Sequence, residues 1–182
     1  HYDEVQCGIG RTGKLFAYEW AGKAAPDIIS LAKGLGGGFP VGACLATADA
    51  ASGMTAGAHG TTFGGNPLAM ATANAVLDVV LGDGFLDHVD RTARALWEQL
   101  TDLQKRYPTV IEQVRGAGLM LGLKCVVDSG KFIATMMDNE MLAVGAADNV
   151  VRLLPPLIMG EAEAKQAMAA LEATCKTLAA EG

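Results

Sequence analysis

The first 65 residues alternate short apolar runs with glycine-rich segments. The runs at 26–32 and 41–47 predict buried strands, because short apolar runs bounded by glycine or proline are typical of a sheet core. Residues 1–5 indicate the end of a further strand that runs into a loop. Glycine clusters at 7–13 and 34–40 predict tight loops, since glycine adopts backbone conformations that other residues avoid. We therefore expect a loop-rich α/β structure in this part of the chain.

Helical spacing replaces the short runs after residue 65. Asn66 followed by Pro67 predicts a helix start, with Asn66 as the N-cap and Pro67 at the first helical position. The helix expected over 68–81 is almost wholly apolar, so we expect it to be buried on most of its sides. A second helix is predicted over 85–107, where apolar residues follow i, i+3/i+4 spacing. These apolar positions are Leu86, Val89, Ala93, Leu96, Leu100 and Leu103.

The pattern changes again after Pro108, where short strands and helices alternate. We expect a small α+β lobe here, joined to the first part by the long helix. The predicted elements are strands at 110–114 and 119–127 around a turn at 115–118, a helix at 131–139, strands at 141–144 and 149–154, and a helix from 160 to 179.

Composition and charge exclude several classes of protein. The 14 Lys and Arg against 20 Asp and Glu give a net charge of −6. The sequence has no block of basic residues, which argues against a nucleic-acid-binding surface. Four cysteines without CxxC spacing and three scattered histidines offer no metal template, so we expect free thiols in a reducing cytoplasm. No apolar run reaches the roughly 18–20 residues of a membrane span, and we expect no signal peptide, because no basic segment followed by an apolar segment opens the sequence.

The segment GIGRTG at 8–13 matches the G-x-G-x-x-G pattern of dinucleotide-binding loops. Such a loop must follow a strand and open a helix that binds a pyrophosphate. The following segment, KLFAYEWAG, is too short and too rich in helix-breaking residues to provide that helix. A nicotinamide dehydrogenase is therefore a weak alternative, and a glycine-rich loop packed near an active site is the preferred interpretation.

Lys33 is the strongest candidate for chemistry, because it ends a buried apolar run and precedes the segment GLGGGFP. Burial in an apolar pocket lowers the pKa of a lysine and makes its amine a nucleophile. The glycines would let a planar ligand approach the backbone. The competing interpretation is a lysine at a strand end that reaches solvent.

Other polar residues fit the same chemistry. Asp3, at the end of another strand, could face a protonated ring nitrogen, which is the partner that pyridoxal phosphate (PLP) requires. Gln6 could donate to the phenolic oxygen of such a ring. The segment HGTTFGGNP at 59–67 offers hydroxyls, glycine amides and a helix N-terminus for a phosphate. Taken singly, each of these features also fits ordinary turn or loop chemistry.

The chain resembles the class-III, fold-type I PLP aminotransferases, and is most similar to the acetylornithine/succinylornithine group. The resemblance rests on five segments in the family's order, and it covers nearly the whole chain. It implies an α/β fold, with 1–95 as the C-terminal part of the PLP-binding large domain and 96–182 as a small α+β domain. The five segments are DEVQCGIGRTGKLFAYE, PDIISLAKGLGGGFPVGACLAT, HGTTFGGNPLA, VRGAGLMLGL and VRLLPPL.

The resemblance implies a role for individual residues. Lys33 matches the lysine that binds PLP covalently, and it would also act as the general base. Asp3 matches the partner of the pyridine nitrogen, Val5 packs on a ring face, and Gln6 binds the ring's phenolic oxygen. Thr62 matches a residue that reaches the phosphate of the neighbouring subunit's cofactor. A further residue, Arg152, matches the arginine that binds the substrate α-carboxylate, for which a planar guanidinium is suited; without the motif it reads equally as a surface arginine.

Family members carry roughly 200 further residues before the segment DEVQ, and the resemblance implies that this N-terminal half is missing here. The implied reaction of the complete cytoplasmic homodimer transfers an amino group from N-acetylornithine to 2-oxoglutarate, in arginine biosynthesis. Ornithine, succinylornithine and 4-aminobutyrate remain alternative amino donors. The chain alone is expected to be inactive, so a non-catalytic folding or dimerisation unit is the competing class of function.

Overall fold

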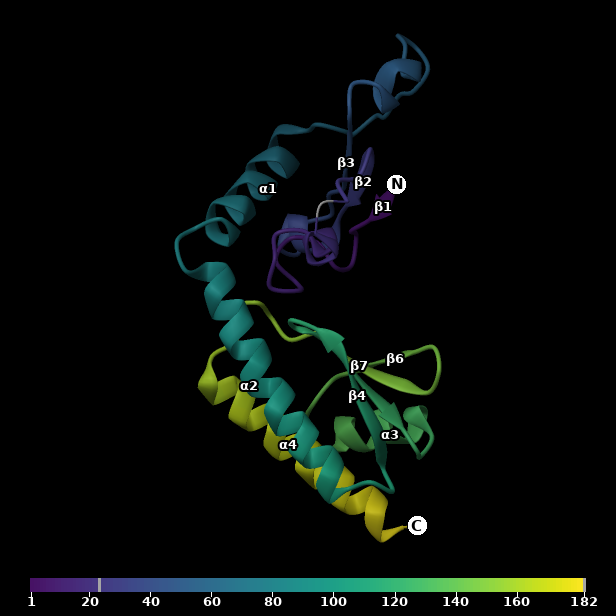
Figure 1. The fold of residues 1–182 in the computed structure, drawn as a ribbon, viewed down its shortest axis with the longest axis vertical. Coiled ribbons are helices and arrows are strands. Elements are labelled where there is room, and N and C mark those ends of the chain that lie inside the picture. The colour runs from purple at the N-terminus through teal and green to yellow at the C-terminus, as the bar shows by residue number, and fades with distance from the viewer. Residues whose placement is uncertain (23, 182) are drawn as a thin grey trace. The chain divides into compact units, whose positions relative to one another are not determined.

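The computed structural model describes residues 1–22 and 24–181, and the chain divides into two compact units, His1–Leu86 and Asp87–Gly182 (Figure 1). The division lies near the start of helix α2 (Phe85–Arg106). This division does not test the domain boundary expected after residue 95, which stays a prediction.

The first unit is built on a three-stranded sheet with the order β1-β2-β3. Strand β1 (Tyr2–Asp3) is parallel to β2 (Ile28–Leu31), which pairs antiparallel with β3 (Ala43–Ala46). The strands predicted from apolar runs are confirmed, although each is shorter than its run. Three 3₁₀ helices interrupt the loops: η1 (Ala17–Ala21), η2 (Lys33–Gly36) and η3 (Ala50–Gly53).

Helix α1 (Pro67–Val80) begins as the sequence predicted. The Asn66 Oδ1 accepts a hydrogen bond from the Ala69 amide at 2.9 Å, and Pro67 is the first helical residue. Within α1 only Ala69, Ala73 and Val80 are buried. Leu68 is 63% exposed, so the expectation that this helix is buried on most sides is wrong for the chain as described. The described part of the first unit supplies packing partners for one face of α1 only.

The second unit contains an antiparallel sheet with the order β4-β5-β7-β6. One sheet face is apolar and buried, with Leu121, Leu123, Val151 and Leu153 at 8% exposure or less. The predicted apolar face of α2 is buried from Val89 to Leu103. The elements are β4 (Ile111–Ala117), β5 (Met120–Cys125), α3 (Ser129–Asp138), β6 (Val144–Ala146), β7 (Val150–Leu153) and α4 (Glu161–Ala180).

Two predicted boundaries in the second unit are wrong. Strand β4 continues through the segment predicted as a turn, because Ala117 pairs with Met120 and the hairpin turns at 118–119. Gly118 has a φ of 56°, a conformation that a tight hairpin requires and glycine adopts readily. Strand β6 begins at Val144 rather than at residue 141, because the Met141 amide donates to the Met136 carbonyl at the end of α3.

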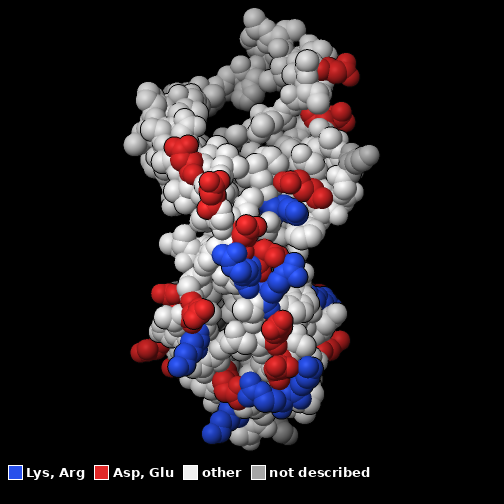
Figure 2. All heavy atoms as spheres, turned by 60° about the vertical axis from the view of Figure 1, so that its left-hand side comes forward, with Lys and Arg blue, Asp and Glu red and all other residues white. Residues whose placement is uncertain are grey.

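Charged side chains of both signs are interspersed over the second unit on the face that Figure 2 shows. Ion pairs such as Arg94–Asp90 and Lys105–Asp102 lie along α2. Among the described residues all four cysteines are free thiols, and no group of His, Cys, Asp or Glu could bind a metal ion. Within the same residues, no single helix is long and apolar enough to cross a membrane, and only the bent pair α1–α2 meets that criterion jointly.

The N-cap gives a first prediction. Replacing Asn66 by Ala removes the acceptor for the Ala69 amide and should destabilise the first turn of α1 by about 1 kcal/mol. Hydrogen exchange of the Ala69 amide measures this local opening. The matched control is Asn74→Ala, the same chemical change at an exposed position inside α1, which should leave protection unchanged or raise it. Equal protection in Asn66→Ala and the unchanged chain would show that the cap contributes nothing.

Candidate active site

Lys33 lies directly after β2, at the start of η2, with a backbone φ of 46°. The left-handed region costs a residue with a side chain roughly 1–2 kcal/mol, and such strain is concentrated at functional positions. The Lys33 Nζ donates a hydrogen bond to the Gln6 Oε1. Lys33 is exposed, so the burial expected from its apolar neighbours is not found. The described part of the first unit surrounds the strand end on one side only and leaves the amine open to solvent.

Strand pairing brings Asp3 and Gln6 next to the end of β2, and Val5 lies between them in the chain. In the parallel register Asp3 pairs with Ser30, so the carboxyl ends of β1 and β2 lie side by side. Gln6 then follows Asp3 by three residues, as Lys33 follows Ser30. The Asp3 Oδ1 accepts only the Val5 amide, at 3.0 Å, and the carboxylate is exposed. An amine, an amide and a carboxylate are thus gathered at one sheet edge.

Glu4 is a residue of this site that the sequence reasoning missed. Its side chain is 3% exposed, and its carboxylate accepts the Tyr18 amide at 2.8 Å and the Ala17 amide at 2.9 Å. Glu4 directly follows β1, and its side chain is buried where those of Tyr2 and Asp3 are exposed. The buried carboxylate ties the β1 end to η1, which is far away in the sequence.

The backbone of Glu4 is held as firmly as its side chain. Its amide donates to the Ser30 carbonyl at 3.0 Å, and its carbonyl accepts the Gly8 amide at 2.9 Å. A Cβ on Gly8 would lie 2.8 Å from that carbonyl oxygen, so this position requires glycine. The segment 8–13 continues as a loop, and the next helix is the five-residue η1 rather than a phosphate-binding α-helix. The nicotinamide alternative is therefore excluded by the local fold.

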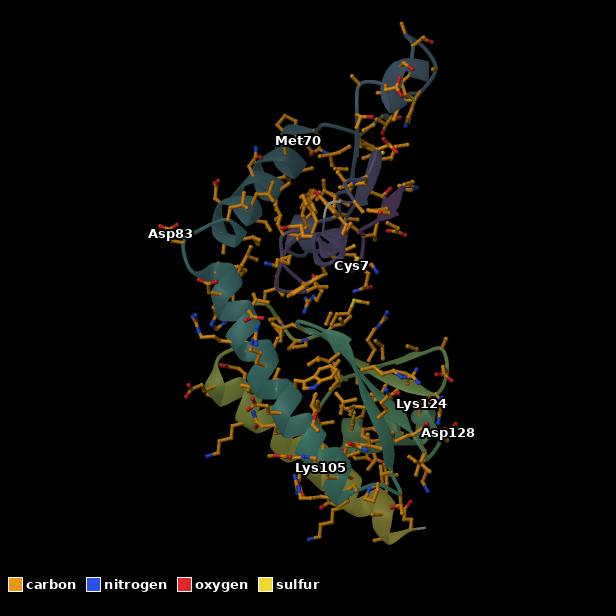
Figure 3. All side chains as sticks on the ribbon, in the orientation of Figure 1. Cys7, Met70, Asp83, Lys105, Lys124 and Asp128 are labelled. Atoms are coloured by element: carbon orange, nitrogen blue, oxygen red, sulfur yellow. The ribbon has the colours of Figure 1, made fainter. Side chains whose placement is uncertain are left out.

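Cys7 lies in the loop after β1, in the first unit (Figure 3). Its thiol donates to the Glu4 Oε2 at 3.3 Å. Burial, followed by this bond to the Glu4 carboxylate, raises the pKa of the Cys7 thiol to about 11. Cys7 therefore remains a neutral donor near pH 8 and helps to hold Glu4 in place.

Thr62 lies on an exposed segment between η3 and α1. The neighbouring Thr61 accepts the Gly64 amide on its hydroxyl at 3.2 Å, which closes a local turn. Within the described chain, no hydrogen bond joins Thr62 to Lys33 or Asp3. The structure thus joins Gln6 to Lys33 beside Asp3, and it shows no contact of Thr62 with them among the described hydrogen bonds.

Arg152 lies on β7 in the second unit, where it pairs with Gly122 on β5 and Val144 on β6. Its Nε is buried and has no hydrogen-bond partner among the described residues. The residue borders a pocket of about 220 Å³. A buried guanidinium N–H without an acceptor is costly, so this position is suited to an anion supplied by a ligand.

The role of Glu4 can be tested through Cys7. In Glu4→Gln one carboxylate oxygen becomes an amide NH₂, which cannot accept the Ala17 or Tyr18 amide, and the charge that raises the Cys7 pKa is lost. We expect the midpoint of Cys7 alkylation against pH to fall from about 11 toward the ordinary thiol value, and η1 to loosen by about 2 kcal/mol. Iodoacetamide kinetics with peptide mapping measure the first effect, and hydrogen exchange at Tyr18 the second.

Glu19→Gln is the control for this test, because it makes the same change in an exposed carboxylate that accepts the Phe16 amide nearby. It should leave the Cys7 midpoint in place. A Cys7 profile that is the same in both variants and in the unchanged chain would contradict the anchoring role of Glu4.

Comparison with known proteins identifies relatives along almost the whole chain. The family model described as aminotransferase class-III matches residues 2–175. An acetylornithine aminotransferase of Brucella melitensis is 60% identical over 176 residues, which are 97% of this chain and 43% of the relative. One from Mesorhizobium japonicum is 61% identical over 178 residues, or 98% of this chain and 44% of the relative. The chain thus spans less than half the length of these relatives.

Solved structures give the same result for the fold. Plasmodium falciparum ornithine delta-aminotransferase superposes with a TM-score of 0.91 at 32% identity, covering 99% of this chain and 46% of that one. An N-acetylornithine aminotransferase from Stenotrophomonas maltophilia superposes with a TM-score of 0.85 at 34% identity, covering 99% of this chain and 47% of that one. The expected α/β fold of this class is confirmed.

Proposed function

This chain belongs to the class-III aminotransferase family, and we propose that it is the part of an acetylornithine aminotransferase that carries the cofactor lysine. Enzymes of this family depend on PLP. The observation that carries the proposal is the strained Lys33, whose amine meets Gln6 beside Asp3 at adjacent strand ends. The relatives at 60% and 61% identity support the assignment of the substrate class.

The residues at this sheet edge fit PLP. The Lys33 amine is open to solvent and can attach an aldehyde, the Asp3 carboxylate keeps an oxygen without a described partner, and Gln6 offers an amide. In the loop after Lys33, a Cβ at Gly38 would meet nothing within 4 Å, so this position leaves room for a ligand, whereas a Cβ at Gly36 or Gly37 would lie 2.9 or 2.8 Å from a valine side chain. When bound, PLP supplies an electron sink that stabilises negative charge next to the amino group of the substrate.

The chain's own residues then have separate tasks. Lys33 attaches the cofactor and afterwards accepts and returns a proton at its Nζ. Asp3 keeps a ring nitrogen positively charged, Gln6 orients the ring oxygen, and Val5 packs against one ring face. Arg152 binds the substrate α-carboxylate through paired N–H donors, and thereby orients the carbon that loses the proton. Thr62 contributes its hydroxyl to the phosphate of a neighbouring subunit.

The reaction of the complete enzyme is the reversible conversion of N-acetylornithine and 2-oxoglutarate to N-acetylglutamate semialdehyde and glutamate, in arginine biosynthesis in the cytoplasm. Ornithine is the second candidate donor, because ornithine aminotransferases superpose with TM-scores of 0.90 and 0.91. Their identity of 29–32% is far below the 60% and 61% of the acetylornithine aminotransferases of Brucella melitensis and Mesorhizobium japonicum, which favours the acetylated donor.

Catalysis requires residues outside this chain. The relatives are more than twice as long, and we propose that their additional residues complete the phosphate site and cover Lys33. The 182 residues alone would then be a folded but inactive unit. Helix α1 exposes Leu68, Val79 and the following Leu81 at 63%, 55% and 58%, which suits a helix that packs against another chain in a homodimer.

The separate roles of Lys33 and Arg152 can be tested in an enzyme of full family length, made by joining this chain to the N-terminal part of the Brucella melitensis relative. Arg152→Ala should lower kcat/KM by about 30- to 5,000-fold, because a hydrogen-bonded charge partner is lost. The loss should appear with both N-acetylornithine and 2-oxoglutarate, since each presents an α-carboxylate. Arg152→Lys should recover part of it, because lysine keeps the charge but not the paired donors.

Lys33→Ala should give the opposite pattern in the same enzyme. The visible absorbance of lysine-bound cofactor should disappear together with turnover, whereas Arg152→Ala should retain that absorbance. Single-turnover kinetics with each substrate distinguish the two variants. A loss in only one half-reaction, or loss of the absorbance in Arg152→Ala, would show that the role given to Arg152 is wrong.

We also expect the 182-residue chain to associate in solution through exposed apolar surface such as that of α1. Light scattering at tens of micromolar should show a dimer or larger species, and the double variant Leu68→Lys, Val79→Lys should shift the population toward monomer. A single species of 18.8 kDa in the unchanged chain would contradict this expectation.

A further inference from the structure

The sheet face that carries Arg152 also carries two other cations, Arg115 on β4 and Lys124 on β5. The register places Arg115 opposite Gly122, and Gly122 opposite Arg152. Directly paired residues of neighbouring strands share a sheet face, so the two arginines flank Gly122 in one row. Two strand spacings separate their Cα atoms by about 10 Å. Side chains as long as arginine can converge on one ligand across that distance.

Gly122 lies in the middle of this row and has no side chain of its own. A Cβ at Gly122 would lie 2.9 Å from Val150 Cγ1, so Val150 occupies the space that a side chain there would need, and valine cannot readily turn aside because it is branched at Cβ. A pocket of about 220 Å³ lies along the row. Its lining residues are mostly small or apolar and include Arg115 and Arg152. They are Arg115, Gly116, Ala117, Met120, Leu121, Gly122, Ala146, Val150 and Arg152, and no carboxylate is among these described residues.

Asp148, in the turn between β6 and β7, controls the charge of this row. Its carboxylate accepts Arg115 Nη1 at 2.7 Å and Lys124 Nζ at 2.5 Å. The bond from Lys124, followed by the bond from Arg115, lowers the pKa of Asp148, so it is ionised at neutral pH. Figure 3 shows Lys124 on the side of the second unit where the β6–β7 hairpin lies. The Arg152 Nε, in contrast, has no partner within the described residues.

We propose that Asp148 is a specificity-determining residue of the Arg152 site. Asp148 binds Arg115 and Lys124, and the Gln113 Oε1 also accepts the Arg115 Nε, so Arg152 is the arginine of this row whose Nε has no partner among the described residues. The pocket therefore accepts a single carboxylate and gives no added affinity to a second carboxylate on the same molecule. This inference rests on the proposed function of Arg152 and adds to it the number of carboxylates that the site recognises on its ligand.

The test compares two acids of the same chain length, glutarate with two carboxylates and pentanoate with one. Both are titrated into the 182-residue chain at constant ionic strength, while NMR follows the Nε–Hε signals of Arg152 and Arg115. In the unchanged chain both acids should shift the Arg152 signal with similar affinity. In Asp148→Asn the Arg115 Nη1 loses its charged partner, whereas the Arg115 Nε still donates to the Gln113 Oε1 at 2.9 Å. The terminal nitrogens of Arg115 should then bind the second carboxylate, so glutarate should gain about tenfold over pentanoate.

The variants are chosen to change charge without changing shape. Asp148 has a φ of 64°, and asparagine adopts this left-handed conformation as readily as aspartate, so the turn is preserved. Asp138→Asn makes the same change in net charge at an exposed position on α3 and should not alter the preference between the acids. Adding Arg115→Gln to Asp148→Asn should remove the gain for glutarate.

An unchanged ratio of glutarate to pentanoate affinity in Asp148→Asn would overturn the inference, as would an equal gain in Asp138→Asn or a gain that survives Arg115→Gln. Failure of the proposed function gives a different result. In that case neither acid shifts the Arg152 signal of the unchanged chain, and the inference fails with it.

Discussion

The buried carboxylate of Glu4 is the contact on which the first unit depends. It accepts two amides of η1 and a thiol, while its backbone pairs with β2. Four separate segments meet at this residue, and it lies between Asp3 and Val5, directly after strand β1. A carboxylate that is buried and fully bonded has one position. The orientation of Asp3 and Gln6 toward the end of β2 therefore follows from a residue that faces away from the site.

Under the proposed function, the two units of the chain supply different functional groups. The first presents an amine, a carboxylate and an amide at one sheet edge, and the second presents a guanidinium without a partner among the described residues. Both arrangements leave a polar group open for a ligand. The exposure of Lys33 and of the apolar side of α1 fits a chain that spans less than half the length of its relatives.

Much of this structure could be predicted from local patterns. The start of α1 follows from Asn66 and Pro67, and the buried face of α2 follows from its spacing, because both depend on neighbouring residues alone. The β4–β5 turn was misplaced because Gly116 resembles a turn residue but lies within a paired strand. The exposure of Lys33 and of one side of α1 could not be predicted from their apolar neighbours in the sequence. It depends on which other segments pack against them. Glu4 was missed because the two amides that donate to its carboxylate lie 13 and 14 residues further along the chain.

The central claim is that Lys33 is the lysine that receives the cofactor. The most direct measurement incubates the 182-residue chain with PLP, fixes any lysine-bound cofactor by borohydride reduction, and maps the modified peptide by mass spectrometry. We expect the label to be concentrated on Lys33 and Glu4→Gln to reduce it, because the neighbouring Asp3 and Gln6 lose their fixed position. Label distributed over the exposed lysines, with no preference for Lys33, would show that Lys33 is not the lysine that receives the cofactor.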